Sequence, residues 1–255
     1  MVFQAIITDL DRTLLRDDKT VSDYTLAVLA RARQRGIRLV VATARPEQDV
    51  GRLYPGLGFD GAVYHNGALV CHAGGIRTHH GIPSDEAARI CRAILADHPG
   101  RRLAIEMDGT RYSNFDVTEI WPGSSYIPCD FTDVPQFVAE KILVPLDAGA
   151  APDWGRYLGP QLYVQVAEGS LGMVMDKTAQ KLLGVRELGE AMGFGLAQAA
   201  AFGDDLNDIG MIEACGVGVA VANALDEVKA RADHVCLSNQ QDGVARWVEE
   251  NILRG

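Results

Sequence analysis

Two carboxylates stand close together directly after a short apolar run near the start of the chain. Asp9 and Asp11 follow the apolar residues 3–8. Carboxylates at this spacing beyond a strand can converge on one cation, and such oxygen ligands suit Mg²⁺, which also neutralises phosphate charge. The backbone amides of residues 10–13 can cradle an anion. The alternative interpretation is a turn that caps a helix, because Asp and Thr are common there.

A second acidic cluster lies nearly two hundred residues further along the chain. Asp204, Asp205 and Asp208 follow another apolar run. If both clusters reach one edge of a sheet, their carboxylates repel one another, which raises pKa values and costs stability. A divalent cation resolves that repulsion. A solvated loop before a helix is the alternative, since acids are favourable at a helix N-terminus.

A hydroxyl and an amine complete the set of groups that suit a phosphorylated ligand. Thr43 ends an apolar run and can offer its hydroxyl and backbone amide to a phosphate oxygen. Lys181 precedes the second acidic cluster and is a candidate cation for the phosphate, with Lys177 as the rival for that role. The residues alone leave both lysines open for this role.

The elements that must position these groups alternate between strands and helices. The predicted strands are residues 3–8, 37–42, 61–64, 199–202, 217–221 and 234–237, and the main predicted helices are 22–35, 178–192 and 224–231. Such alternation favours an α/β fold, a doubly wound, mostly parallel Rossmann-like core with helices on both faces. Ligands of these sheets bind at the carboxyl ends of the strands, where the polar clusters lie.

The middle of the chain differs from the two ends. It contains one long predicted helix, residues 84–96, and short strand-like runs such as residues 102–107, 142–145 and 162–166, separated by Pro and Gly. We interpret residues 81–177 as an inserted α+β domain, and residues 1–80 together with 178–255 as the core.

Composition excludes several classes of protein. The 255 residues are 47% hydrophobic and 23% charged, which is typical of a soluble globular enzyme. A net charge of −10 argues against nucleic acid or anionic membranes as partners, and a phosphate site must therefore supply its own local positive field. The five cysteines are dispersed along the chain, which favours neither a disulfide framework nor a zinc site. No secretory segment or membrane span is predicted, so we expect a cytoplasmic protein.

These clusters, in this order, resemble the motifs of the haloacid dehalogenase superfamily of phosphotransferases. The matching residues are Asp9, Asp11 and Thr13, then Thr43, then Lys181, and finally Gly203, Asp204, Asn207 and Asp208. Residues 66–68, 201–204, 218–220, 223–224 and 242–245 resemble the Cof-type branch, whose inserted domain is an α/β (type IIB) cap. The chain departs from the family at three positions, with Arg12, Ala44 and Leu182 where glycine is usual. The spacing of Lys181 to Leu188 and Gly193 still fits the family's helix, so the resemblance favours Lys181 over Lys177.

The resemblance implies a role for each matched position. Asp9 would be the nucleophile that forms an aspartyl-phosphate, and Asp11 the general acid and base. Asp9 and Asp204 would bind Mg²⁺ through their side chains, and Asp11 through its backbone carbonyl. The groups implied for phosphate binding are the backbones of Leu10 and Ala44 and the side chains of Thr43, Lys181 and Asn207. Asp205 or Asp208 would orient Lys181 or metal-bound water, and Arg45 is a supporting residue near the site.

The function that this resemblance implies is a Mg²⁺-dependent phosphatase for monoesters of small metabolites, with sugar phosphates favoured. A phosphohexomutase and a non-catalytic regulatory protein of the same fold are the alternatives. The expected partner is a small phosphorylated metabolite, and both a monomer and a homodimer stay open. Residues that could select the substrate are Arg45, Glu106, Asp108, Tyr112, Trp121 and Tyr163.

Overall fold

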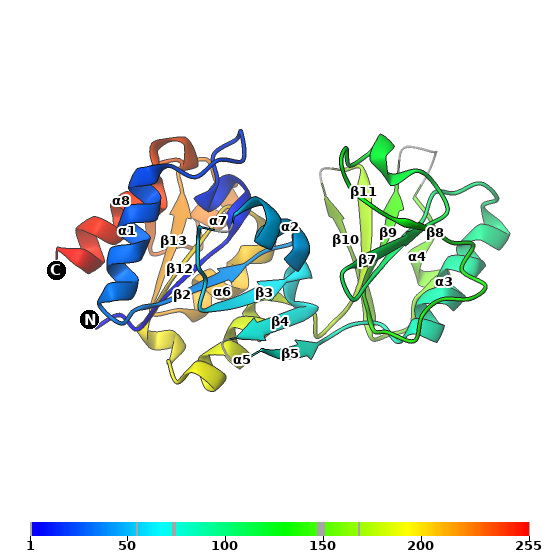
Figure 1. Cartoon of the computed structure of the whole chain (residues 1–255), viewed down its shortest axis with the longest axis horizontal. Coiled ribbons are helices and arrows are strands. Elements are labelled where there is room, and N and C mark those ends of the chain that lie inside the picture. Colours follow the sequence, from blue (N-terminus) through cyan, green and yellow to red (C-terminus); the bar gives the residue numbers. More distant parts are fainter. Residues whose placement is uncertain (1, 55, 73–74, 147–150, 168, 255) are drawn as a thin grey trace. The chain divides into compact units, whose positions relative to one another are not determined.

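The chain forms two compact units in the computed structural model, which describes residues 2–54, 56–72, 75–146, 151–167 and 169–254. The first unit comprises residues 1–78 and 180–255, and the second comprises residues 79–179 (Figure 1). Within these described ranges, no helix combines the length and the apolar character that a membrane span requires.

A single eight-stranded sheet forms the centre of the first unit, in the order β14-β13-β12-β1-β2-β3-β4-β5. The six strands from β14 to β3 run parallel, and β4 pairs with β3 in the antiparallel direction. Two runs of strands extend in opposite directions from the centre, which is the doubly wound arrangement. The strands are β1 (Ala5–Thr8), β2 (Arg38–Ala42), β3 (Gly61–Tyr64), β4 (Leu69–His72), β5 (Ile76–His79), β12 (Ala199–Gly203), β13 (Val217–Val221) and β14 (His234–Cys236).

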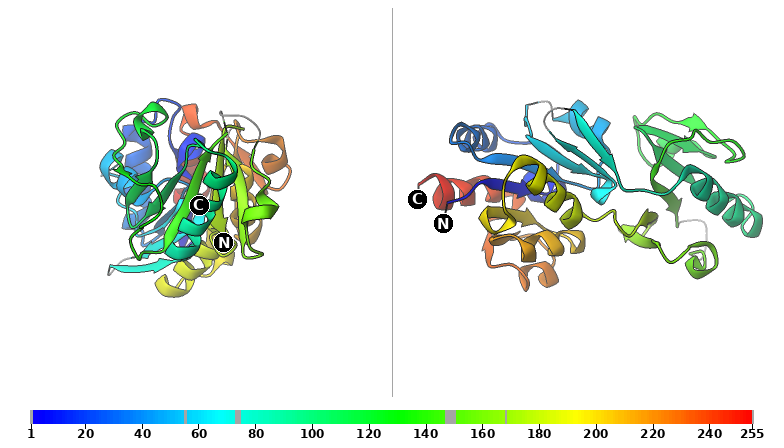
Figure 2. Two further views of the ribbon diagram at one scale, coloured as in Figure 1. Left: turned by 90° about the vertical axis from the view of Figure 1, so that its right-hand side faces the viewer. Right: turned by 90° about the horizontal axis from the view of Figure 1, so that it is seen from below.

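Helices cover both faces of this sheet, because its central strands are apolar on both sides. On one face, α1 and α8 pack side by side over a core that includes Ile6 and Leu39 (blue and red ribbons in Figures 1 and 2). On the other face, α5 and α6 pack over a core that includes Ile7 and Val40. The helices are α1 (Asp23–Gln34), α2 (Glu47–Leu53), α5 (Lys181–Met192), α6 (Ile209–Ala214), α7 (Asp226–Lys229) and α8 (Gly243–Val248).

Helix α1 illustrates how local sequence sets the bounds of an element. Ser22 caps its N-terminus, where the hydroxyl oxygen accepts a hydrogen bond from the amide of Thr25 at 3.0 Å. The chain leaves the helix at Gly36, whose φ of +81° lies in the left-handed region that glycine tolerates.

The second unit is a six-stranded sheet in the order β10-β11-β9-β6-β7-β8, with its own core. Its pairs are antiparallel except for β7 with β8. The core contains residues of β6, β9 and α3, and Tyr157 of α4. The elements are β6 (Ala104–Met107), β7 (Thr110–Ser113), β8 (Ile127–Pro128), β9 (Ala139–Pro145), β10 (Leu162–Ala167), β11 (Leu171–Asp176), α3 (Ser84–Asp97) and α4 (Trp154–Tyr157).

The predicted fold class is confirmed, with some elements missed or misjudged in length. Strands β4, β5, β7, β8 and β11 were not predicted. Strand β7, for example, reads Thr-Arg-Tyr-Ser, which has no apolar run, and it exists because it pairs with β6. Helix α7 covers residues 226–229 rather than 224–231, whereas β9 extends over residues 139–145 rather than 142–145.

Candidate active site

The strand order explains why the polar clusters meet. Strand β1 lies between β12 and β2, and Thr8 is in register with Phe202 on one side and Val41 on the other. The residues that follow these parallel strands therefore emerge at the same edge of the sheet. The amide of Asp9 donates to the carbonyl of Phe202 at 3.0 Å, which holds the first acidic segment against the second.

Lys181, the first residue of α5, lies at the centre of the buried charges. Its Nζ donates to Oδ1 of Asp9 and to Oδ1 of Asp208, each at 2.7 Å, and the lysine is only 3% exposed. Burial opposes the ammonium, but the two carboxylates outweigh it, so that the pKa of Lys181 is raised and the side chain is charged. Lys177 belongs to the second unit, where its Nζ donates to the carbonyl of Pro160.

Three buried carboxylates crowd around this lysine. Asp9, Asp204 and Asp208 place one oxygen each within 4.8 Å of one another. Burial, reinforced by neighbouring carboxylates, raises the pKa of Asp9 to about 8 and the pKa of Asp204 to about 6. A single lysine thus leaves excess negative charge near neutral pH, and a hard divalent cation with oxygen ligands would compensate it.

Asp208 already uses both of its carboxylate oxygens. Its Oδ1 accepts from Lys181, and its Oδ2 accepts from the backbone amides of Asp204 at 2.9 Å and Asp205 at 3.1 Å. Asp9 and Asp204 are therefore the side chains of this cluster that fit a cation. Asp205 is exposed and accepts from the amide of Leu206 at 2.7 Å, so it caps the following turn and does not contact Lys181.

Asp11 forms a separate network beside the buried cluster. Arg45 holds its carboxylate with two hydrogen bonds, at 2.6 Å from Nε and 2.8 Å from a terminal nitrogen, and Lys19 adds a third at 2.7 Å. Partial burial raises the pKa of Asp11, but the hydrogen bonds from Arg45 and Lys19 outweigh it and the net pKa is lowered. Asp11 is accordingly ionised in this arrangement.

Thr43 and Asn207 are linked through Asn66 of the turn after β3. The hydroxyl oxygen of Thr43 accepts from the amide of Arg45 at 3.1 Å, and its carbonyl accepts from the amide of Asn66 at 2.9 Å. Nδ2 of Asn207 donates to Oδ1 of Asn66 at 3.0 Å. Ala44 is half-buried between Thr43 and Arg45, and Leu10 is fully buried, its carbonyl accepting from the amide of Leu15 at 2.8 Å.

Three contacting residues were not among the predicted site residues. Thr13 donates its hydroxyl to Oδ1 of Asp204 at 2.7 Å, and its place in the first motif was the signal for it. Asn66 lies in the Asn-Gly-Ala turn that resembles the family pattern. Lys19 has no sequence signal, because its approach to Asp11 depends on how the loop before α1 folds back.

The residues named for substrate selection in the second unit have structural contacts there. The carboxylate of Glu106 pairs with Arg111 and Lys141, and the guanidinium of Arg111 stacks 4.6 Å from the ring centre of Trp121. The hydroxyl of Tyr163 donates to the carbonyl of Ala179 at 2.9 Å.

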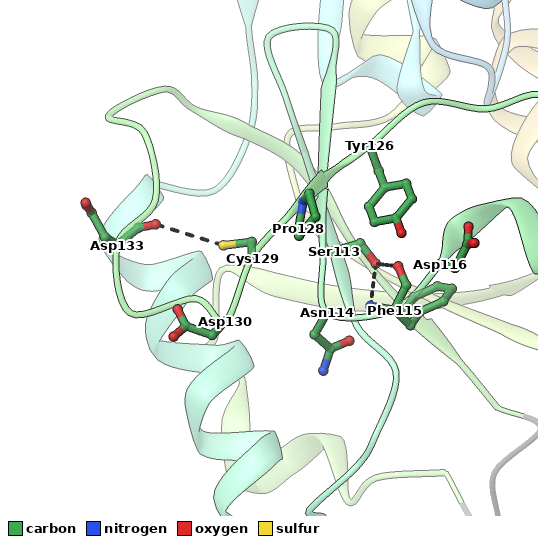
Figure 3. Close-up of a pocket in the computed structure, with 9 residues that line it drawn as sticks. All are labelled: Ser113, Asn114, Phe115, Asp116, Tyr126, Pro128, Cys129, Asp130 and Asp133. Atoms are coloured by element: carbon green, nitrogen blue, oxygen red, sulfur yellow. Dashed lines mark hydrogen bonds between the residues drawn. The ribbon is translucent and has the colours of Figure 1, made fainter.

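The second unit also contains a cavity of about 650 Å³ (Figure 3). Two of its three acidic side chains belong to local turns, since Oδ1 of Asp116 accepts from the amide of Thr118 and Oδ1 of Asp130 from the amide of Thr132. Burial raises the pKa of Cys129, which makes its thiol a poor nucleophile. We assign no chemistry to this cavity, which is lined by Ser113, Asn114, Phe115, Asp116, Tyr126, Pro128, Cys129, Asp130 and Asp133.

Comparisons with known proteins agree over nearly the whole chain. A family model for haloacid dehalogenase-like hydrolases matches residues 6–248. The 5-amino-6-(5-phospho-D-ribitylamino)uracil phosphatase of Bacillus subtilis is 27% identical over 270 residues, which cover 96% of each chain. A pyridoxal phosphate phosphatase of Escherichia coli is 28% identical over 283 residues, which cover 99% of this chain and 100% of the relative.

A solved structure is also similar along its full length. It is described as a sugar phosphatase of subclass IIB of this superfamily, with a TM-score of 0.81, 21% identity, and coverage of 97% of this chain and 98% of that one. At this level of identity the similarity concerns the fold, a Rossmann-like core carrying an inserted cap.

Proposed function

We propose that this protein removes phosphate from small phosphorylated metabolites through an aspartyl-phosphate on Asp9. The proposal proceeds from its family, because the chain belongs to the Cof-type branch of the haloacid dehalogenase-like hydrolases and is a phosphoric monoester hydrolase. Sugar phosphates are the substrates we favour. The observation that carries the proposal is the bridge of Lys181 between Asp9 and Asp208, directly beside Asp204.

The position of Asp9 suits a nucleophile. Lys181 holds its Oδ1, whereas its Oδ2 has no hydrogen-bond partner among the described residues. In the first step Oδ2 bonds to phosphorus, and the bond from phosphorus to the ester oxygen breaks. In the second step water attacks phosphorus, the bond to Oδ2 breaks, and phosphate leaves with the carboxylate restored.

Asp11 is proposed to move the protons of both steps. It would give a proton to the departing alkoxide and then take one from the attacking water. Its ion pairs with Arg45 and Lys19 lower its pKa and oppose proton donation. We therefore expect the incoming phosphoryl group to compete for these two cations, which raises the pKa of Asp11 when substrate is bound.

A divalent cation, with Mg²⁺ favoured, is proposed to bind between the side chains of Asp9 and Asp204, with the backbone carbonyl of Asp11 as a third ligand. When bound, the ion neutralises the charge of the carboxylates and the phosphoryl oxygens. The hydroxyl of Thr13 orients Asp204 by donating to its Oδ1. The raised pKa values of Asp9 and Asp204, caused mainly by burial and to a lesser degree by neighbouring carboxylates, support this proposal, because a bound cation would stabilise both groups in their ionised forms.

The test compares phosphate release by the wild type and by Asp9→Asn on a panel of phosphate monoesters, with and without MgCl₂. We expect activity that depends on Mg²⁺ in the wild type and a loss of at least about a thousandfold in Asp9→Asn, because an amide oxygen is a poor nucleophile. The raised pKa of Asp9 means that the metal-free folded state disfavours its ionised form, and an amide cannot ionise, so metal-free Asp9→Asn should melt no lower than the wild type.

The matched control is Asp205→Asn, which makes the same chemical change at the exposed neighbouring carboxylate. It should keep most of the activity. If Asp9→Asn retained wild-type turnover, the aspartyl-phosphate mechanism would be refuted, and an isomerised sugar phosphate without free phosphate would indicate a mutase.

A further inference from the structure

Arg12 has a backbone conformation that favours glycine. Its φ is +61° and its ψ is 3°, in the left-handed region that side chains rarely adopt. The conformation is held locally, because Nδ2 of Asn223 donates to the carbonyl of Arg12 at 2.7 Å. A non-glycine residue that is kept in this region beside an active site suggests that its side chain has a use there.

The guanidinium of Arg12 lies where the buried acidic cluster meets solvent. Its Nε is 3.8 Å from Oδ2 of Asp204, and the side chain of Arg12 is 59% exposed whereas that of Asp204 is 9% exposed. The carboxylate of Asp17 is a second nearby charge. Within the described part of the chain the guanidinium donates no hydrogen bond, so its donors are available to a ligand.

The other cations of the site are already engaged at much shorter distances. Lys181, Arg45 and Lys19 each lie between 2.6 and 2.8 Å from a carboxylate oxygen. Lys181 is buried beside the nucleophile and suits the transferred phosphoryl group. Arg12, at the exposed edge of the same cluster, suits the part of the substrate that remains outside.

We propose that Arg12 is a specificity-determining residue that binds a second anionic group, a carboxylate or another phosphate, on the leaving portion of the substrate. This inference rests on the proposed phosphatase function. A guanidinium presents paired donors that match the oxygens of a carboxylate or phosphate, which an ammonium cannot do in the same way. In a protein of net charge −10, such a local cation is what allows a doubly anionic substrate to approach.

The rival role for Arg12 is that of a counter-ion for Asp204 and Asp17. A counter-ion would affect all substrates alike, whereas a specificity residue affects only those with a second anion. Two matched pairs of substrates separate these roles: 3-phosphoglycerate with glycerol 3-phosphate, and fructose 1,6-bisphosphate with fructose 6-phosphate.

The experiment measures kcat/KM for both pairs in the wild type, Arg12→Gly and Arg12→Lys. In Arg12→Gly we expect kcat/KM for the doubly anionic member to fall about tenfold to a hundredfold relative to its partner, from the loss of a charge-assisted hydrogen-bonded pair. Arg12→Lys should retain part of the preference. Because glycine tolerates the positive φ, Arg12→Gly should fold and melt no lower than the wild type.

The control Arg231→Ala removes one exposed arginine that pairs with Glu213, and it reproduces the change in net charge. Its substrate ratios should equal those of the wild type. Equal losses for both members of each pair in Arg12→Gly would overturn the inference and leave the phosphatase function standing. A wild type that released phosphate from no substrate of the panel would overturn the proposed function itself.

Discussion

At the scale of single residues, Gly203 shows how the absence of a side chain lets the acidic cluster form. A Cβ at this last residue of β12 would lie 2.4 Å from Cβ of Asp208 and 2.6 Å from its Oδ2. Only glycine therefore leaves space for the side chain of Asp208 to pack against the end of the strand. From there Asp208 accepts from two backbone amides and positions Lys181.

Substitution Gly203→Ala should damage both stability and activity. The added methyl forces Asp208 or the strand end to move, which we expect to cost about 1–3 kcal/mol in the free energy of unfolding. Because Asp208 orients Lys181, kcat should fall together with stability. Urea unfolding and phosphate release measure the two effects.

Gly56→Ala is the matched control, since a Cβ at Gly56 would meet no atom within 4 Å. Its stability and kcat should be close to those of the wild type. If Gly203→Ala behaved like Gly56→Ala, close packing between the strand end and Asp208 would not be what requires glycine.

At the scale of elements, strand β9 buries an acidic side chain in the second unit. Glu140 is completely buried, its Oε1 accepts from the amide of Asp108 at 3.2 Å, and its Oε2 has no hydrogen-bond partner among the described residues. Nδ1 of His79 lies 3.4 Å from Oε1, and Glu106 is a further nearby charge. Burial, aided by the charges of Glu106 and Asp108, raises the pKa of Glu140 to about 7.

The raised pKa predicts how the stability of the second unit depends on pH. The folded state favours the protonated form of Glu140. The stabilisation that this preference adds to the free energy of unfolding is therefore fully present below about pH 4.5 and is lost as the pH rises through about 7. Glu140→Gln mimics the protonated form and should remove this loss. Between pH 5.5 and 8.5 we expect the free energy of unfolding of the wild type to fall by about 2 kcal/mol more than that of Glu140→Gln, measured by urea unfolding.

Glu119→Gln provides the control for this comparison, because Glu119 is exposed and pairs with Arg102 at the surface. Its pH dependence should follow that of the wild type. Parallel curves for the wild type and Glu140→Gln would show that Glu140 does not titrate in this range.

At the scale of the whole molecule, the second unit is one continuous segment with a separate core. Residues 79–179 contain the sheet from β10 to β8 and the helices α3 and α4. Their core contains fully buried side chains such as Ile90, Ile105 and Phe131. A core of this kind in about a hundred residues is typical of a domain that folds by itself.

We therefore expect residues 79–179 to fold when expressed alone. The isolated segment should unfold in one cooperative transition in urea, followed by circular dichroism. The variant Ile105→Ala in the same segment should lower the free energy of unfolding by about 2–5 kcal/mol, as expected for a packed core. A segment without a cooperative transition would show that the second unit depends on the first for its stability.

Much of the core and of the candidate site follows from local sequence. Apolar runs that end in polar residues predict β1, β2 and β12, and the carboxyl ends of these strands carry Asp9, Thr43 and Asp204 to one edge of the sheet. Such signals are local, because a parallel strand buried on both faces must be apolar along its length. Strand β7 lacks that signal, because its sequence Thr-Arg-Tyr-Ser contains no apolar run and the strand forms by pairing with β6, where Met107 is in register with Thr110.

The sequence by itself thus determined the fold class and the groups available for chemistry, because strand burial and residue types are properties of short segments. Only the tertiary structure decided which cation meets Asp9 and which hydrogen bonds each carboxylate accepts. Lys181 reaches Asp9 because α5 packs closely on β3, where a Cβ at Gly184 would lie 2.7 Å from Val63. Asp208 supports Lys181 and Asp205 does not, because hydrogen bonds to backbone amides turn one side chain inward and leave the other exposed.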